Sequence, residues 1–424
     1  MKLRDKLNLI LFLVAIFGFA IVNLLRPHSE TSSNLEQRDI AKQPEFTKDR
    51  FFAGDYTREF DNYFADNFAF RTSLIQVGSS IKELKGLPDD NGISIVVQGG
   101  DNMGGDKSAT DGKTKGGTTD AGEGSTVTDV NTSKYIIAKD RAFIAFKYSA
   151  AASKKYADAL NQFRKSVGPD VSVYSLLAPT AVEFSSNKNI QKLTESQKDA
   201  FAHVNERLDP SIGQVDAYSG LAEHKDEYIY FRTDHHWTAL GAYYAYSKFM
   251  ETIGEKPVPL SEYKKSNIED FLGTAYKQTL RSELKTHPDT ITYYTPFTNY
   301  KYTMHTSPTR SSEKKVVDPN FAKYSSTFYA VFLGGDYPWG EISTDNKNGK
   351  RIVVVKDSYA NAFVPFLLPH FEKVYYLDPR HYQGNLLDFV KEHKITDVLF
   401  LNNSTVAKNT GVTDQILDKM KKGK

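Results

Sequence analysis

Residues 351–359 read Arg-Ile-Val-Val-Val-Lys-Asp-Ser-Tyr, a pattern that specifies a layered architecture. The aliphatic run from Ile352 to Val355 predicts a strand buried on both faces, as in a parallel sheet. The largely apolar run from Ala360 to Leu368 predicts a helix directly after it. A buried strand that turns into a helix is the repeating unit of an α/β fold. Ser358 lies in the turn, at the carboxyl end of the strand, where such folds gather their ligands.

The same alternation extends over the second half of the chain. Strands are expected at 171–178, 374–377 and 397–401, and helices at 150–167, 195–208, 238–254, 384–391 and 414–422. A hairpin is expected from 135–138 and 142–146, across a polar turn. Together these elements predict an α/β fold, a flavodoxin-like or SGNH-like three-layer sandwich with a mostly parallel sheet.

Composition divides the chain into five consecutive parts, the last of which contains an insertion of its own. We expect a cytoplasmic N-terminus with a transmembrane anchor, a polar stalk, a helical first part of the main domain, a disordered low-complexity insertion, and the main domain with an irregular insertion of its own. The corresponding ranges are 1–27, 28–45, 46–98, 99–133, 134–424 and, within the last, 256–348.

The first 27 residues carry a membrane signal. Basic residues at Lys2, Arg4 and Lys6 precede a run from Leu7 to Leu25 that is apolar apart from two asparagines. Nineteen helical residues reach roughly 28 Å, close to the hydrocarbon thickness of a bilayer. The basic residues place the N-terminus inside, which predicts a single-pass protein of the cell membrane with an extracellular domain. A cleaved signal peptide is the alternative, although no small-residue cleavage site follows the run.

Charge and cysteine content exclude several functions. With 54 Lys plus Arg and 52 Asp plus Glu, the net charge of +2 gives no electrostatic reason to expect a nucleic-acid partner. The chain has no cysteine, which excludes thiol catalysis, thiolate metal sites and disulfides. A neutral substrate such as a glycan is compatible with this balance.

Residues 233–242 read Thr-Asp-His-His-Trp-Thr-Ala-Leu-Gly-Ala and predict a charge-relay base before a helix. In an extended segment Asp234 and His236 fall on the same face, whereas His235 points away. A carboxylate on an imidazole fixes its tautomer and stabilises its protonated form. The alternative is that these residues cap a helix and solvate a loop.

Ser358 is the candidate nucleophile. Backbone amides at the following helix terminus, including its own, are candidate donors to an oxyanion. Weaker candidates for oxyanion or substrate contacts are Tyr359, Asn361, Asn402 and Asn403. The alternative for Ser358 is a simple helix N-cap.

Several residues near these motifs have competing interpretations. Adjacent histidines cannot easily turn both rings onto one ion, so no metal site is expected at His235 and His236. His235 and Trp237 are candidates for lining the pocket around the base, with a structural role and core packing as their alternatives. Tyr337 and Trp339 are candidates for lining a sugar cleft, but core packing is the alternative for each.

Two segments also resemble a known family. The motif Thr233-Asp-His-His-Trp-Thr-Ala-Leu-Gly, together with Lys356-Asp-Ser-Tyr-Ala-Asn361 downstream, resembles the DHHW family of Gram-positive bacteria. That family is related to the SGNH-like acetyltransferase domains of the alginate O-acetylation proteins AlgX and AlgJ. The resemblance includes 55–71 and the order of the motifs, with the Asp-His pair before the serine.

The resemblance implies an SGNH-like O-acetyltransferase with Ser358, His236 and Asp234 as its triad and no cofactor. It further implies a cell-wall or surface polysaccharide as substrate, and an acetyl donor supplied by a membrane-bound O-acyltransferase partner. A carbohydrate esterase of the same fold, or a cell-envelope binding protein without catalysis, is the alternative. The sequence does not distinguish transfer of the acyl group to a sugar from transfer to water.

Overall fold

A computed structural model describes most of the chain from residue 133 onward and parts of the N-terminal region. The described residues are 12–14, 17–18, 21, 32–33, 38–39, 41–70, 74, 77, 93–98, 133–321 and 328–421. Most of the expected anchor and all of 99–132 lie outside them. Among the residues that the structure describes, no helix has the length and apolar character needed to cross a membrane.

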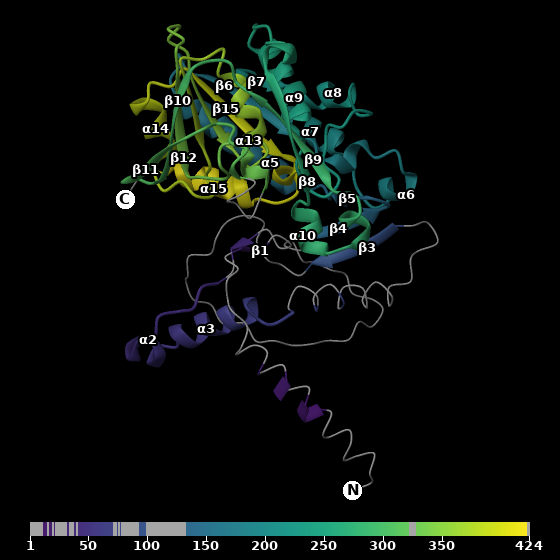
Figure 1. Cartoon of the computed structure of the whole chain (residues 1–424). Coiled ribbons are helices and arrows are strands. Elements are labelled where there is room, and N and C mark those ends of the chain that lie inside the picture. Colours follow the sequence, from purple (N-terminus) through teal and green to yellow (C-terminus); the bar gives the residue numbers. More distant parts are fainter. Residues whose placement is uncertain are drawn as a thin grey trace.

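An eight-stranded mixed sheet forms the centre of the main body (Figure 1). Its order is β11-β10-β12-β14-β13-β15-β6-β7. The last five strands in that order are mutually parallel, and the first three are antiparallel to their neighbours. The bounds are β6 Ser172–Ala178, β7 Ile212–Val215, β10 Tyr300–Ser307, β11 Arg310–Lys314, β12 Trp339–Thr344, β13 Arg351–Lys356, β14 Lys373–Leu377 and β15 Asp397–Asn403.

Helices cover both faces of this sheet, which makes the three layers expected from the sequence. Along β13 the side chains alternate, with Ile352 and Val354 facing one apolar core and Val353 and Val355 the other. The first core includes residues of α8 Ala217–Ala222, α9 Ala239–Thr252, α13 Ala360–Phe363 and the 3₁₀ helix η4 Val364–Leu367. The second includes residues of α5 Ala150–Ser166, α7 Gln197–Asn205, α14 Leu386–Glu392 and α15 Gly411–Met420.

The segment 256–348 differs from the irregular insertion expected. It supplies β10, β11 and β12 to the main sheet, which is why the sheet is mixed, and it pairs β8 Lys264–Phe271 with β9 Asp289–Thr295. Its Tyr and Thr residues are typical of strands that bury one face, and β9 and β12 bury alternate side chains along part of their length. Its short helices are η2 Leu260–Glu262, α10 Thr274–Thr279, α11 Ser282–Lys285 and η3 Phe328–Val331.

A second, three-stranded antiparallel sheet contains the expected hairpin, in the order β3-β4-β5. Tyr135, Ile137 and Ala142 pack against Ala275 and Tyr276, so this sheet contacts the region of α10 (Figure 1). The bounds of the remaining elements are β1 Ser32–Ser33, β2 Arg38–Asp39, α2 Lys48–Phe52, α3 Asp55–Asp66, β3 Ile93–Gln98, β4 Ser133–Ala138, β5 Arg141–Ile144, η1 Ala181–Phe184, α6 Lys188–Gln191 and η5 Ser404–Ala407.

Strand β11 forms one outer edge of the main sheet. All five of its residues are exposed, and it pairs only with β10 within the described part of the sheet. Glu313 of this strand forms an ion pair of 2.7 Å with Lys301 of β10.

Candidate active site

A closed loop presents Asp234 and His236 ahead of α9. An antiparallel bridge joins Tyr230 to Trp237 and closes the loop between them, and the hydroxyl of Thr238 caps α9 by accepting from the amide of Gly241 at 3.3 Å. The loop bends, whereas an extended segment was expected. Asp234 Oδ1 accepts from the backbone amide of His236 at 2.9 Å, a turn that brings the two side chains together.

Three side chains form a continuous chain of hydrogen bonds. Asp234 Oδ1 lies 2.6 Å from His236 Nδ1, and His236 Nε2 lies 2.7 Å from Ser358 Oγ. An ionised carboxylate can only accept, so Nδ1 donates and Nε2 is left to accept the hydroxyl proton of Ser358. The structure thus brings together residues 122 positions apart in the sequence.

The carboxylate of Asp234 is held ionised although only 3% of the residue is exposed. Burial opposes the charge, but electrostatic interaction with the imidazoles of His236 and His235 outweighs it. Hydrogen bonds from the His236 side chain and the Thr274 amide add to this, and together they hold the pKa of Asp234 well below its usual range. Thr274 donates to Asp234 Oδ2 at 2.7 Å.

A second buried carboxylate, that of Asp289 in β9, holds the backbone just before Asp234. It accepts from the amides of Arg232 at 2.9 Å and Thr233 at 2.7 Å, and from the hydroxyl of Thr233 at 2.5 Å. The Thr233 hydroxyl oxygen in turn accepts from the amide of Gly273 at 2.9 Å. This network links the loop before Asp234 to the segment 271–276.

The turn after β13 leaves one backbone amide available at Ser358. The amide of Tyr359 donates to Asp357 Oδ1, that of Ala360 to the Asp357 carbonyl, and that of Asn361 to the Ser358 carbonyl. Among the described residues the amide of Ser358 has no acceptor, so it is the candidate oxyanion donor. Helix α13 spans only four residues, so the helix-terminus contribution expected from the sequence is small.

Asp357 itself caps this turn and does not contact the imidazole of His236. Its Oδ2 accepts from the amide of Asn403 at 2.7 Å, which joins the ends of β13 and β15. Burial raises the pKa of Asp357, against the opposing hydrogen bonds from these amides.

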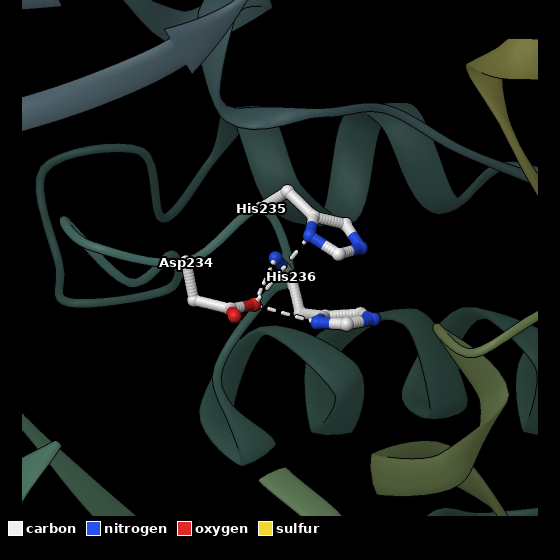
Figure 2. Close-up of side chains that lie close together, drawn as sticks. All are labelled: Asp234, His235 and His236. Atoms are coloured by element: carbon white, nitrogen blue, oxygen red, sulfur yellow. Dashed lines mark hydrogen bonds and ion pairs between the residues drawn. The ribbon is translucent and has the colours of Figure 1, made fainter. Parts of the chain in front are cut away.

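His235 differs from the outward orientation expected. Its ring lies 3.9 Å from that of His236, centroid to centroid, and its Nδ1 lies 3.9 Å from Asp234 Oδ1 (Figure 2). Burial lowers the pKa of His235 to about 4, and the nearby charge of His236 contributes, so its ring is neutral at pH 7. In the described residues, Asp234, His235 and His236 are the cluster with metal-ligand spacing. Asp234 already accepts hydrogen bonds from three N–H groups. A carboxylate surrounded by hydrogen-bond donors suits a charge relay better than the binding of a metal ion.

The weaker candidates have mainly structural contacts. Trp237 is fully buried and donates from Nε1 to the Tyr359 carbonyl at 2.8 Å. The Tyr359 hydroxyl donates to the His235 carbonyl, and Asn361 Nδ2 donates to Asp336 at 2.9 Å.

The remaining candidates lie in the sheet or beside it. Asn402 accepts from Tyr156 of α5 at 2.9 Å, and Asn403 caps η5. Trp339 stacks on His305 at 3.6 Å, and the half-buried Tyr337 lies against Gly334. Neither aromatic residue contacts His236 or Ser358.

A buried ionic network supports the end of β13. Lys356 Nζ, fully buried, lies 2.8 Å from Asp336 Oδ1 and 3.6 Å from Asp378 Oδ2. Asp336 also accepts from Arg380 at 2.8 Å. Burial opposes the charge of Asp336, but Lys356 and Arg380 outweigh it and hold its pKa well below the usual range. This network ties the loop before β12 to the turn that carries Ser358.

Sequence reasoning missed the residues that the segment 256–348 contributes to the site. Thr274 and Asp289 position Asp234 and the loop before it, and Tyr329 of η3 stacks on His236. The sequence holds no motif around them. The local sequence offers one indication, Gly273 directly before the short helix that begins at Thr274. A glycine at such a position permits another part of the backbone to approach closely.

Comparison with known proteins places the chain among relatives of the same architecture. A DHHW family protein from Eubacterium siraeum is 34% identical in a match covering 69% of this chain and 96% of that one, with a TM-score of 0.60. Bacillus cereus PatB1, in a structure with a sulfonyl adduct, is 21% identical over 68% of this chain and 98% of its own, with a TM-score of 0.57. The O-acetyltransferase domain of Pseudomonas putida AlgJ is more distant, at 13% identity over 66% and 96% and a TM-score of 0.39.

No curated protein sequence matches the chain. The family profile for DHHW proteins matches residues 89–377, a range that contains both the Asp-His-His-Trp motif and the Ser358 turn. The chain belongs to the DHHW family.

Proposed function

We propose that the chain is an O-acetyltransferase that acts through a covalent acyl-enzyme on Ser358. The observation that carries this proposal is the unbroken hydrogen-bond chain from Asp234 through His236 to Ser358, with distances of 2.6 and 2.7 Å. This is the arrangement that activates a serine, which is otherwise a weak nucleophile at neutral pH.

The proposed reaction has two halves. His236 Nε2 takes the proton of Ser358 as Oγ bonds to the acetyl carbonyl carbon, and the Ser358 amide donates to the oxyanion. Collapse breaks the bond to the donor group, which leaves with the proton from His236. A sugar hydroxyl then attacks the acetyl-serine and His236 takes its proton. The bond from the acetyl carbon to Ser358 Oγ breaks, and His236 returns the proton to Oγ as the product ester forms.

A structurally similar protein supports this chemistry. A sulfonyl group becomes attached to proteins at nucleophilic side chains, and the PatB1 structure contains a sulfonyl adduct. The triad geometry gives this chain a side chain of that kind. The acetyl acceptor is a hydroxyl of a cell-wall or surface polysaccharide.

The proposed setting is the outer face of the cell membrane. The apolar run from Leu7 to Leu25 holds the enzyme there as a single-pass anchor. The acetyl donor comes from a membrane-bound O-acyltransferase partner, because acetyl-CoA is a cytoplasmic metabolite.

The experiment combines the full-length chain with a chromogenic acetyl ester and a cell-wall oligosaccharide. Wild type is compared with Ser358→Ala, His236→Ala and a matched control, Ser311→Ala, an exposed serine of β11. We expect acetylated oligosaccharide from wild type and the control, and loss of activity in the other two. Acetyl release to water alone would identify an esterase instead. Equal activity in all four would rule out the serine mechanism, and no activity in any of them would favour a binding protein without catalysis.

A further inference from the structure

The imidazole of His236 lies between two other rings. The Tyr329 ring is 3.9 Å away, centroid to centroid, and nearly parallel at 7°. The His235 ring is also 3.9 Å away, tilted by 36°. Two rings at that distance cannot occupy the same face of an imidazole, so Tyr329 and His235 cover opposite faces.

Tyr329 is held firmly in this position. It lies in η3 and is 6% exposed, and its ring meets the edges of Phe231 at 6.3 Å and Phe332 at 5.4 Å. Its hydroxyl donates to the Ser358 carbonyl over 3.4 Å, a long hydrogen bond. Burial raises the pKa of Tyr329 well above its usual value, so the ring that faces His236 is a neutral phenol.

This stacking has two physical consequences. A flat ring against each face prevents the imidazole from rotating about its bond to the rest of the side chain, and so keeps Nε2 directed at Ser358 Oγ. The face of an aromatic ring is also electron-rich and attracts a cation, so the phenol favours the imidazolium that forms as His236 takes a proton. The neutral His235 ring adds no repelling charge on the other side.

We propose that Tyr329 is a positioning residue for the catalytic base, which holds the His236 ring in register with Ser358 and stabilises its protonated form. The proposal rests on the proposed function, since it assumes that His236 is the base. It assigns a role to the segment 256–348, which delivers Tyr329 to the site from outside both sequence motifs.

Other groups that titrate or carry charge lie near this imidazole and its neighbouring rings, and they are constant in the test below. On its own segment these are Asp234 and His235. From the elements packed around the site they are Asp336, Asp357, Tyr359 and Arg380.

The test measures sulfonylation of Ser358 in the full-length chain by phenylmethanesulfonyl fluoride, followed by mass spectrometry across a range of pH. In this reaction the Oγ–S bond forms, the S–F bond breaks, fluoride leaves, and His236 takes the hydroxyl proton. We expect Tyr329→Leu to lower the rate by about 3- to 30-fold. The midpoint of its pH–rate profile should move to lower pH, because the protonated base has lost its partner. Tyr329→Phe, which keeps the ring face, should stay within about threefold of wild type.

A graded series guards against loss of folding in Tyr329→Leu. Phenylalanines with one, two and three ring fluorines at position 329 keep the shape of the ring, and each added fluorine withdraws electron density from its face. The rate should fall stepwise along this series. A flat series, or a Tyr329→Leu variant with the rate and midpoint of wild type, would overturn the positioning role.

Two controls separate the possible failures. Phe371→Leu removes a buried ring of the same core that pairs with neither Tyr329 nor His236, and it should keep the rate of wild type. A rate loss in Phe371→Leu equal to that in Tyr329→Leu would assign the effect to core packing and overturn the proposal. If wild-type Ser358 does not react at all, the proposed function itself falls. If Ser358 reacts and the series is flat, only the role of Tyr329 falls.

Discussion

The backbone amide of Thr274 donates to Oδ2 of Asp234 over 2.7 Å, across 40 residues of sequence. Oδ1 of the same carboxylate is committed to the amide and ring of His236. Both oxygens are therefore fixed, one by the loop that contains the motif and one by the segment that follows β8. The orientation of the Asp234 carboxylate depends on close contact between these two backbones.

Gly273→Ala should abolish that contact. A Cβ at position 273 would lie 2.2 Å from Asp234 Cβ and 2.5 Å from Oδ2, so the carboxylate must move. Displacing a catalytic group by about 1 Å costs roughly 100-fold in rate, which we expect in kcat for the chromogenic ester. Gly168→Ala is the matched control, because a Cβ there meets nothing within 4 Å. Equal rates for the two variants would contradict the tight fit at Gly273.

Thr233→Val and Thr233→Ser should separate the hydroxyl from the methyl group. The buried hydroxyl bridges Asp289 Oδ2 at 2.5 Å and the amide of Gly273 at 2.9 Å. Valine leaves the Gly273 amide without this acceptor and removes one of the donors to Asp289 Oδ2, which keeps the backbone amide of residue 233. The expected cost is about 2 to 4 kcal/mol in the free energy of unfolding, whereas serine keeps the bridge and should cost about 1 kcal/mol. Urea denaturation measures both. Similar losses for the two variants would show that the methyl group, rather than the bridge, matters.

Asp234→Asn should leave the fold intact and reduce kcat by about 10³- to 10⁴-fold. An amide in place of the carboxylate no longer fixes the Nδ1–H tautomer of His236 or stabilises its protonated form. Steady-state hydrolysis of the ester, with a thermal melt for each protein, tests this. Asp170→Asn, an exposed aspartate, serves as the control and should match wild type in both measurements.

His235 should make the fold sensitive to mild acid. Its pKa is about 4 in the folded protein, mainly because of burial, against an ordinary value of 6.5. Between these values the unfolded chain binds the proton more readily, so the free energy of unfolding falls as pH drops from 6.5 to 4, by up to about 3 kcal/mol. The pKa of Asp234 is lowered in the folded protein. Its contribution to the free energy of unfolding is therefore lost only when the pH falls below the ordinary aspartate pKa of 3.8. Unfolding midpoints measured across this window should change less in His235→Asn, and parallel curves for both proteins would contradict the burial of a neutral ring.

Asp336→Asn should destabilise the protein more than loss of a surface carboxylate. Lys356 is fully buried, and without Asp336 its remaining carboxylate is Asp378 at 3.6 Å. Leaving a buried charge poorly compensated costs about 3 kcal/mol or more in the free energy of unfolding. Asp345→Asn, which alters an exposed hydrogen bond to Asn299, should cost under about 1 kcal/mol in the same urea titration. A small loss for both would mean that Asp378 compensates Lys356 without Asp336.

The parallel half of the sheet was predictable because its strands are short, continuous and apolar. β13, β14 and β15 lie within three residues of the ranges expected, and β6 and α5 start and end almost where the periodicity placed them. Strand β7, Ile212–Val215, was missed because only its two ends are buried and it follows a turn. Strands β10 to β12 were missed because half-buried strands rich in Tyr, Thr and Ser lack the continuous apolar run that marks a buried strand.

The part of the site that lies within the two sequence motifs was predictable. Asp234, His236 and Ser358 each lie in a recognisable local pattern, and their meeting followed from the carboxyl edge of the sheet. The orientation of His235 was not predictable, because it depends on a bend stabilised by one side chain-to-backbone hydrogen bond. Tyr329, Thr274 and Asp289 were invisible for a different reason, since their roles come from tertiary contacts with no short-range pattern.

The exposed edge strand β11 bears on how the main sheet avoids pairing with other chains. An unpaired strand edge offers free amides and carbonyls to any passing extended chain, and long apolar edges of this kind seed aggregation. Here the edge strand reads Arg310-Ser-Ser-Glu-Lys314, three charged residues and two serines. It has no apolar side chain that an added strand could bury. A strand from another chain that paired with β11 would have to desolvate these charged side chains. The charges therefore oppose the addition of further strands at this edge of the sheet.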